Sequence, residues 1–154
     1  MRKMNEQEIR QTLWIRKWST ICTLTPGQTP YAIEVTYFMP DKNHMNFMIN
    51  PWGTTVGNIL KNPHVLLKVT LADFDLSHWI GVSVFGIARM ESSPERILQG
   101  WQLLGQVMNA DYGRAAEKFV QASEKSPLLS VKIQELTGRC SAGPGKKIDF
   151  KMFD

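Results

Sequence analysis

The feature that most limits the folds open to this chain is a succession of short β-rich runs. TICTLT (20–25), PYAIEVTYFM (30–39) and HMNFMIN (44–50) follow one another, separated by Pro26-Gly27 and by a turn over 40–43. HVLLKVTLA (64–72), WIGVSVFGIARME (79–91) and LLSVKIQELTG (128–138) come later. Runs of β-branched and aromatic residues bounded by turn residues predict strands. The first three runs predict an antiparallel meander, and the run over 79–91 is long enough to cross a barrel and bend at Gly86.

Few helices are expected between these runs. The segment from Asn5 to Lys17 has a candidate cap at Asn5 with Glu8 three residues later, which predicts a short leading helix. A second short helix is predicted from Gly53 to Asn62, with Thr54 or Thr55 as its cap. Two more are predicted: one opens at Ser93-Pro94, and the next runs from Tyr112 to Ser123 with Ala115, Phe119 and Val120 inward.

The order of these elements indicates the fold class. Strand and helix do not alternate regularly, which argues against a doubly wound parallel sheet. Six antiparallel strands with few helices favour a closed or split barrel, because closure removes the unpaired edges. We therefore predict a mainly β fold with flanking α-helices, a six-stranded antiparallel split β-barrel. The tail over 148–154 is expected to be a short edge strand or a segment that docks on a partner.

Composition limits the organisation and the partners. A chain of 154 residues that is 43% hydrophobic and 21% charged predicts one domain over 1–154. The net charge of +4 favours an anionic partner such as a phosphorylated cofactor, and the basic residues are too scattered to form a track for nucleic acid. The charged start and the lack of 18 consecutive apolar residues predict a soluble cytoplasmic protein without a membrane segment.

The motifs of many enzyme classes are missing. The sequence has no Walker loop, no G-x-G-x-x-G, no H-E-x-x-H and no G-x-S-x-G. The three histidines, His44, His64 and His78, fall in separate segments, so no metal site is predicted. Cys22 and Cys140 are expected to be reduced thiols, and Cys22 lies in an apolar strand where burial disfavours the thiolate.

One stretch carries a specific signal, MNFMINPWGTTVGNILKNPHVLLKV (45–69). It predicts a strand, a tight turn through Pro51-Trp52-Gly53, and a helix that begins at Thr54 and Thr55. Unpaired amides and the positive end of the helix dipole make such a turn a cradle for a phosphate group, and two hydroxyls add donors. A connecting helix that is simply capped by threonine is the alternative.

This stretch resembles the pyridoxamine 5'-phosphate oxidase-like, FMN-binding split-barrel superfamily. That superfamily shows a strand, a Gly/Ser turn, two residues that contact phosphate, an Asn/Gln-Ile/Leu pair and then N-P-x-V. GVSVFGIARMES (81–92) also resembles its long strand of the type V-x-V-x-G-x-A. The matching positions in the stretch are Phe47, Gly53, Thr54, Thr55, Asn58, Ile59, Asn62, Pro63 and Val65.

The resemblance implies a function and a set of site residues. It implies an FMN-binding flavoprotein that works as an oxidoreductase on a small molecule, and a homodimer with the flavin at the interface. Gly81 stands where the oxidases tend to carry a polar side chain, so a nitroimidazole-reductase-like branch is expected rather than vitamin B6 oxidation. A non-catalytic flavin- or haem-binding carrier or stress protein is the alternative, and deazaflavin or haem are the alternative cofactors. The implied cofactor-binding residues are Val35, Thr36, Met48, Ile49, Asn50, Gly53, Thr54, Thr55 and Asn58.

Overall fold

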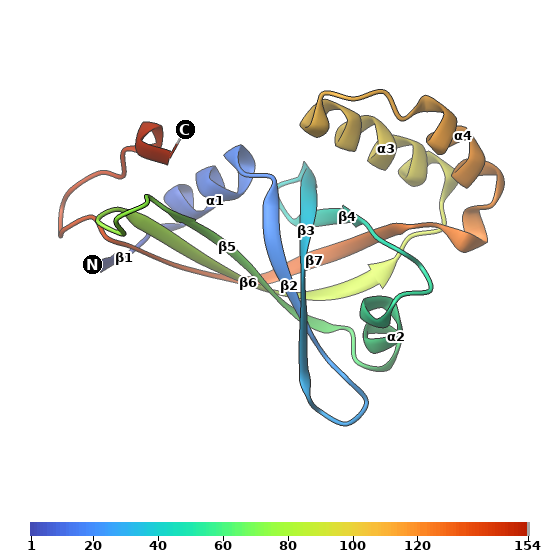
Figure 1. Cartoon of the computed structure of the whole chain (residues 1–154), viewed down its shortest axis with the longest axis horizontal. Helices are drawn as coiled ribbons and strands as arrows, with labels where there is room; N and C mark the ends of the chain where they lie inside the picture. Colours follow the sequence, from blue (N-terminus) through green and yellow to red (C-terminus); the bar gives the residue numbers. More distant parts are fainter. Residues whose placement is uncertain (154) are drawn as a thin grey trace.

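The structure, a computed structural model, is built around a closed antiparallel β-barrel (Figure 1). It describes residues 1–153, leaving out the side chains of residues 123 and 152. Neighbouring strands follow the order β7-β4-β3-β2-β5-β6, and β6 pairs back onto β7, which closes the barrel as predicted. A short β1 adds to the outer edge of β7. The strands are β1 (Arg2–Lys3), β2 (Trp18–Leu24), β3 (Pro30–Asp41), β4 (His44–Met48), β5 (His64–Ala72), β6 (Trp79–Met90) and β7 (Leu128–Cys140).

The predicted meander is confirmed. β2, β3 and β4 pair antiparallel in sequence order, with Ile21 opposite Ile33 and Tyr37 opposite Phe47. β2 begins at Trp18, two residues before the predicted start, because Trp18 still pairs with Thr36. The two-residue strand β1 was not predicted, since so short a segment shows no alternation.

β6 has the predicted alternation, with Ile80, Val82 and Val84 fully buried in the barrel. Its pairing with β7 shifts register between Phe85 and Gly86, where the sequence predicts a bend. A Cβ atom on Gly86 would lie 2.6 Å from Val131 Cγ1, so only glycine fits this close approach of two strands.

The leading helix is also confirmed. α1 (Glu6–Ile15) begins at a capping box in which Asn5 Oδ1 accepts from the Glu8 amide and the Glu8 carboxylate accepts from the Asn5 amide. Its apolar residues Ile9 and Leu13 are buried in the same core cluster as the inward residues of the barrel. The helix therefore packs against the barrel core.

A second layer lies over β3 and β4. α3 (Pro94–Met108) and α4 (Gly113–Gln121) form a helical pair on one side of the barrel (Figure 1). Phe38 and Leu128 of the barrel form a buried cluster with Ile97 and Leu104 of α3. Ser93 caps α3 as predicted. In α4, Ala116 rather than Ala115 is the fully buried residue, while Phe119 and Val120 are half-buried.

The C-terminal segment is not an edge strand. After a short η1 (Ser123–Lys125) and β7, the chain forms a loop and ends in a 3-10 turn, η2 (Phe150–Phe153), and Asp154 lies outside the described residues. Ile148, Phe150 and Phe153 pack against the barrel core, so apolar burial outweighs strand pairing here. Among the described residues, no helix has the length and apolar character needed to cross a membrane.

Candidate functional site

A tight turn joins β4 to α2 (Thr54–Lys61). Asn50 stabilises this turn with two hydrogen bonds. Its carbonyl oxygen accepts from the Gly53 amide at 3.0 Å, and its Oδ1 accepts from the Trp52 amide at 3.0 Å. A Cβ atom on Gly53 would lie 3.2 Å from the Asn50 carbonyl oxygen, which explains a residue without a side chain at this position. Trp52 itself is 74% exposed beside the turn.

The start of α2 differs from the prediction. The N-cap residue is Gly53 and is neither Thr54 nor Thr55. No side chain makes a capping hydrogen bond at this end of the helix. The Gly57 amide donates to the Gly53 carbonyl oxygen at 3.1 Å, so the amides of Thr54, Thr55 and Val56 precede the first intrahelical bond. Within residues 1–153 these three amides have no hydrogen-bond acceptor, and the first turn holds no acidic residue.

The other helices show that this start is unusual. Asn5 Oδ1 accepts from an amide at the start of α1, and Ser93 Oγ does the same for α3. Asp111 Oδ1 accepts from the Gly113 amide at 2.8 Å where α4 begins. In the described part of the chain, α2 is thus the helix whose first amides meet no side-chain oxygen, and its N-terminus is free to take an anion.

α2 is fixed against the barrel by its inner face. Asn58 Nδ2 donates to Thr23 Oγ1 on β2 at 3.0 Å, and both residues are buried. Val56 and Ile59 are buried beside them. Thr54 is exposed at the outer side of the first turn while Thr55 is buried, so the two predicted phosphate ligands differ in access.

The structure brings some of the predicted cofactor residues together at this turn. Asn50, Gly53 and Thr54 lie at its surface. The side chains of the other predicted residues are taken up by packing or lie on β3. Thr55 and Asn58 are buried, and Met48 lies under α3 at Gly100. Ile49 and Val35 pack on the barrel core, and Thr36 is half-buried on the opposite face of β3. The amide of Val56 is a donor that the sequence analysis did not name, because it considered only the two threonines as phosphate ligands.

The fold is shared with proteins of known structure. An FAD-binding protein from Mesorhizobium loti matches at a TM-score of 0.69 and 19% identity, over 92% of this chain and 98% of that protein. A proposed pyridoxamine 5'-phosphate oxidase from Listeria innocua matches at a TM-score of 0.64 and 16% identity, over 88% and 96% of the two chains. The chain shares the split-barrel fold of these proteins.

The same split barrel occurs in a haem-binding protein from Mycobacterium smegmatis. The match has a TM-score of 0.69 and 19% identity, and it covers 95% of this chain and 57% of that protein. No protein-family model matches the sequence, and no curated protein matches it. At these identities the similarity establishes the split-barrel fold, and any ligand has to be argued from the residues of this chain.

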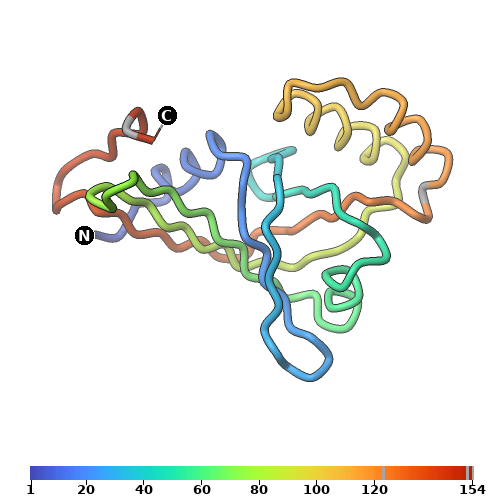
Figure 2. The backbone as a smooth tube through the Cα atoms, in the orientation of Figure 1, coloured from blue at the N-terminus to red at the C-terminus, as the bar shows by residue number. Residues whose placement is uncertain are grey.

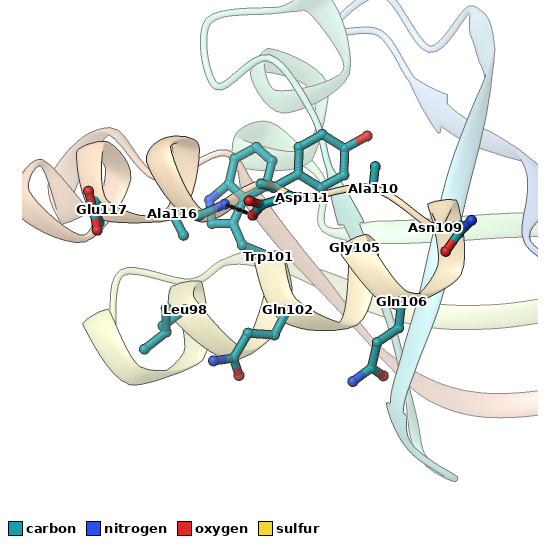
Figure 3. A pocket seen from close by; sticks show the side chains of 12 residues that line it. Leu98, Trp101, Gln102, Gly105, Gln106, Asn109, Ala110, Asp111, Ala116 and Glu117 are labelled. Atoms are coloured by element: carbon teal, nitrogen blue, oxygen red, sulfur yellow. Dashed lines mark hydrogen bonds between the residues drawn. The ribbon is translucent and has the colours of Figure 1, made fainter.

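A large hollow on this split barrel is formed by other elements. It measures about 740 Å³ and lies between α3 and α4 (Figure 3). Trp101 fills part of its wall, stacked on Phe119 with ring centroids 5.7 Å apart. Asp111 Oδ1 already accepts from the Gly113 amide. The hollow lacks a cation or a nucleophile, so it does not rival the turn before α2 as a site for an anionic cofactor.

The histidines do not assemble into a site. His44 Nδ1 lies 2.9 Å from Asp41 Oδ2, His78 Nδ1 lies 2.7 Å from Asp73 Oδ2, and His64 is exposed at the start of β5. Within residues 1–153, no group of three or more His, Cys, Asp or Glu residues is placed to hold a metal ion.

The cysteines are poor nucleophiles. Cys140 is buried, and Cys22 is half-buried on β2. Burial raises the pKa of the Cys22 thiol, the nearby Glu34 carboxylate raises it further, and Lys68 opposes both effects. A thiol with a raised pKa is mostly protonated at neutral pH, so thiolate chemistry is not favoured at this position.

Proposed function

We propose that this protein is an FMN-binding flavoprotein that acts as an oxidoreductase on a small molecule. The observation that carries the proposal is the set of three unpaired amides at Thr54, Thr55 and Val56. A helix start with no capping side chain and no acidic residue suits a dianionic phosphate, which takes several N–H donors and favours the positive end of the dipole. The FAD-binding proteins that share the split barrel support a flavin as the molecule that carries this phosphate.

The chain's own residues have binding and orienting roles in this proposal. Asn50 and Gly53 hold the turn that aims the amides, and the exposed Thr54 hydroxyl adds a donor. Val35, Thr36, Met48 and Ile49 are each half-buried, and in this proposal the parts of these residues that packing leaves exposed border the ribityl chain and the ring. When bound, FMN supplies the hydride or electron transfer, and no acid or base of the chain is assigned to that chemistry.

The proposal includes a homodimer with a flavin at the interface, a small-molecule substrate and an electron donor, in the cytoplasm. Trp14 and Trp18 are 67% and 58% exposed at the end of α1 and the start of β2. Large exposed aromatic residues close together on the chain favour contact with a partner, here a second copy. Light scattering of the full chain tests this, with a mass of about twice 17.6 kDa expected.

The spectrum of the purified protein tests the cofactor. A yellow protein with flavin absorption bands supports the proposal, and chromatography of the released pigment distinguishes FMN from FAD. Bleaching of the bound flavin by NAD(P)H then separates a reductase from a passive carrier. A colourless protein that does not quench the fluorescence of added FMN contradicts the proposal.

Thr54→Glu tests the phosphate position. The glutamate lies in the first turn of α2, where a negative charge stabilises a helix, so the folded protein should be at least as stable as the natural chain. The same charge repels a phosphate at the amides, and we expect FMN affinity to fall at least tenfold. Leu60→Glu, at a residue 73% exposed on the same helix, is the matched control and should leave affinity unchanged. Equal affinities for all three proteins contradict this placement of the phosphate.

Haem binding by the same barrel is the second candidate, favoured by the fold that the chain shares with a haem-binding protein. A Soret band in the purified or haem-titrated protein supports it. Because the two haem propionates are anions as well, the absorption spectrum and not the affinity of Thr54→Glu distinguishes haem from FMN.

A further inference from the structure

A cavity lies between the β5–β6 hairpin and the chain that follows β7. It measures about 280 Å³, and its lining comes from the hairpin, the adjoining ends of β6 and β7, and the C-terminal segment. Figure 2 shows the C-terminal segment (red) leaving β7 beside the hairpin (green) and turning back on the side of the N-terminal helix (blue). None of the residues proposed to bind flavin lines this cavity.

The cavity lies on the inner side of the sheet. Ile80 and Cys140 line it, pair with each other across β6 and β7, and are buried in the core cluster of the barrel. The outer face of β6, at Gly81, is on the other side of the sheet, because consecutive residues of a strand face opposite ways. Ile148 and Phe153 pack against the same core and give the cavity an apolar wall. Ligand pockets usually measure about 300–1,000 Å³, so this cavity suits a molecule with a single ring.

The loop on one wall of the cavity is held in place. Its turn is closed by the Lys146 amide, which donates to the Gly143 carbonyl oxygen at 3.1 Å. Arg2 Nε and Nη2 donate to the Lys146 carbonyl oxygen at 3.2 and 2.7 Å. Arg2 is itself oriented by the Glu8 carboxylate at 2.6 Å. The side chains of this loop therefore start from a fixed backbone.

This wall carries positive charge. Lys146 and Lys147 line the cavity, and within residues 1–153 no carboxylate oxygen lies at salt-bridge distance from either of them. Asp149 also lines the cavity, and its Oδ1 accepts from the Lys151 amide at 3.1 Å. Two ammonium groups beside one carboxylate leave this wall with a net positive charge, which favours an anionic group in the ligand.

The hairpin side of the cavity carries a histidine that an aspartate orients. Burial raises the pKa of Asp73, but hydrogen bonds from His78 and Ser77 lower it to about 2, so Asp73 is an acceptor at neutral pH. Asp73 Oδ2 lies 2.7 Å from His78 Nδ1, and this nitrogen therefore carries a proton. Ser77 Oγ donates to the same carboxylate at 2.9 Å. His78 lines the cavity, and its Nε2, which no hydrogen bond within residues 1–153 uses, is left to accept from a ligand.

We propose that this cavity binds a small aromatic hydroxy acid. Its carboxylate lies between the ammonium groups of Lys146 and Lys147, which make charge-assisted hydrogen bonds, the stronger kind. Its ring lies against the apolar wall at Ile148 and Phe153. Its hydroxyl donates to His78 Nε2 on the hairpin side of the cavity. The inference does not depend on the flavin, because the two sites share no residue.

Titrations of the full chain followed by amide NMR test the proposal. The probes are 4-hydroxybenzoate, benzoate, which lacks the hydroxyl, and phenol, which lacks the carboxylate, at constant pH and ionic strength. We expect saturable shifts of the His78 and Ser141 amides with 4-hydroxybenzoate. The affinity for each of the other two probes should be lower by about fivefold or more, because each lacks one hydrogen-bonding group. Absence of saturable shifts with 4-hydroxybenzoate, or equal affinity for all three probes, overturns the proposal.

Variants of the lining residues separate this cavity from general surface charge. Lys146→Gln combined with Lys147→Gln should weaken 4-hydroxybenzoate binding at least tenfold, whereas Lys151→Gln, at an exposed residue of the same segment outside the lining, should not change it. His78→Phe should abolish the preference for 4-hydroxybenzoate over benzoate, because it removes the acceptor of the hydroxyl. Equal losses in the double variant and in Lys151→Gln, or a preference retained in His78→Phe, overturn the proposal. Thr54→Glu should retain probe binding, which keeps this test independent of the flavin.

Discussion

The side chains of Asn58 and Thr23 join the helix of the candidate site to the barrel, with Asn58 Nδ2 donating to Thr23 Oγ1 at 3.0 Å between two buried residues. They come from α2 and β2, which are far apart in the sequence. Because the bond lies inside the protein, Thr23→Val leaves the Asn58 amide nitrogen without its acceptor, and Asn58→Ala leaves the Thr23 hydroxyl with only a long bond of 3.5 Å to the Tyr31 carbonyl oxygen. The orientation of the α2 amides depends on this contact.

Asn58→Ala should therefore destabilise the fold by about 1–3 kcal/mol, and Thr23→Val by a similar amount. The double variant should cost clearly less than the sum, because the second change removes a group that is already unsatisfied. Urea unfolding of the four proteins measures the coupling. Strictly additive costs would show that the two side chains do not interact in solution.

Two glycines on β6 should respond in opposite ways to alanine. At Gly86 the new methyl group would lie 2.6 Å from Val131 Cγ1 and 2.7 Å from the Lys132 carbonyl oxygen, so Gly86→Ala should cost about 1–3 kcal/mol or more. At Gly81 it meets open space, and Gly81→Ala should be neutral or stabilise by up to about 1 kcal/mol through a less flexible unfolded chain. Thermal unfolding of both variants is the measurement. Similar midpoints for the two would contradict the packing at Gly86.

The barrel could be predicted from the sequence because its strands are marked individually. Alternation over Ile80, Val82 and Val84 gives the inner face of β6, and Asn5 with Glu8 gives the start of α1. The pairing of β6 with β7 that closes the barrel could be inferred only from the cost of unpaired edges, since no local pattern names the partner of a strand. Local sequence patterns therefore predict the individual helices and strands, whereas the closed topology follows from the cost of unpaired strand edges.

The details of the site were less predictable. Threonine is the better N-cap by propensity, yet the turn held by Asn50 brings Gly53 to that position and moves Thr54 and Thr55 into the helix. Whether Met48 faces a ligand or α3 depends on the close approach of Gly100, which a single sequence does not reveal. The pairing of Lys3 with Arg139 depends on a two-residue strand that has no sequence signal.

Asp73 should titrate far below an ordinary aspartate. Burial by itself raises the pKa of Asp73, but hydrogen bonds from the His78 amide and ring and from Ser77 more than reverse this and lower it to about 2. A depressed pKa in the folded state means that the carboxylate stabilises the fold fully above the ordinary value of 3.8 and loses this contribution as the pH falls towards 2. Carboxyl NMR of the folded protein measures the midpoint, and a value near 3.8 would contradict the contacts. Asp73→Asn should reduce the dependence of stability on pH in that window, and the rest is expected from Glu8, Asp41 and Glu95, whose pKa values are also lowered.

Asn50 offers a matched pair of changes that separates the shape of the turn from its charge. Asn50→Ala removes the acceptor of the Trp52 amide, and should cost about 1 kcal/mol of stability and weaken FMN binding by loosening the turn. Asn50→Asp keeps the acceptor, and its negative charge near the start of α2 favours the helix dipole, so stability should be retained. The same charge lies next to the proposed phosphate, and FMN affinity should fall further than in Asn50→Ala. Chemical unfolding measures the stability and fluorescence quenching measures the FMN affinity, both on the same preparations. A stable aspartate variant that binds FMN as tightly as the natural chain would contradict the placement of the phosphate at this turn.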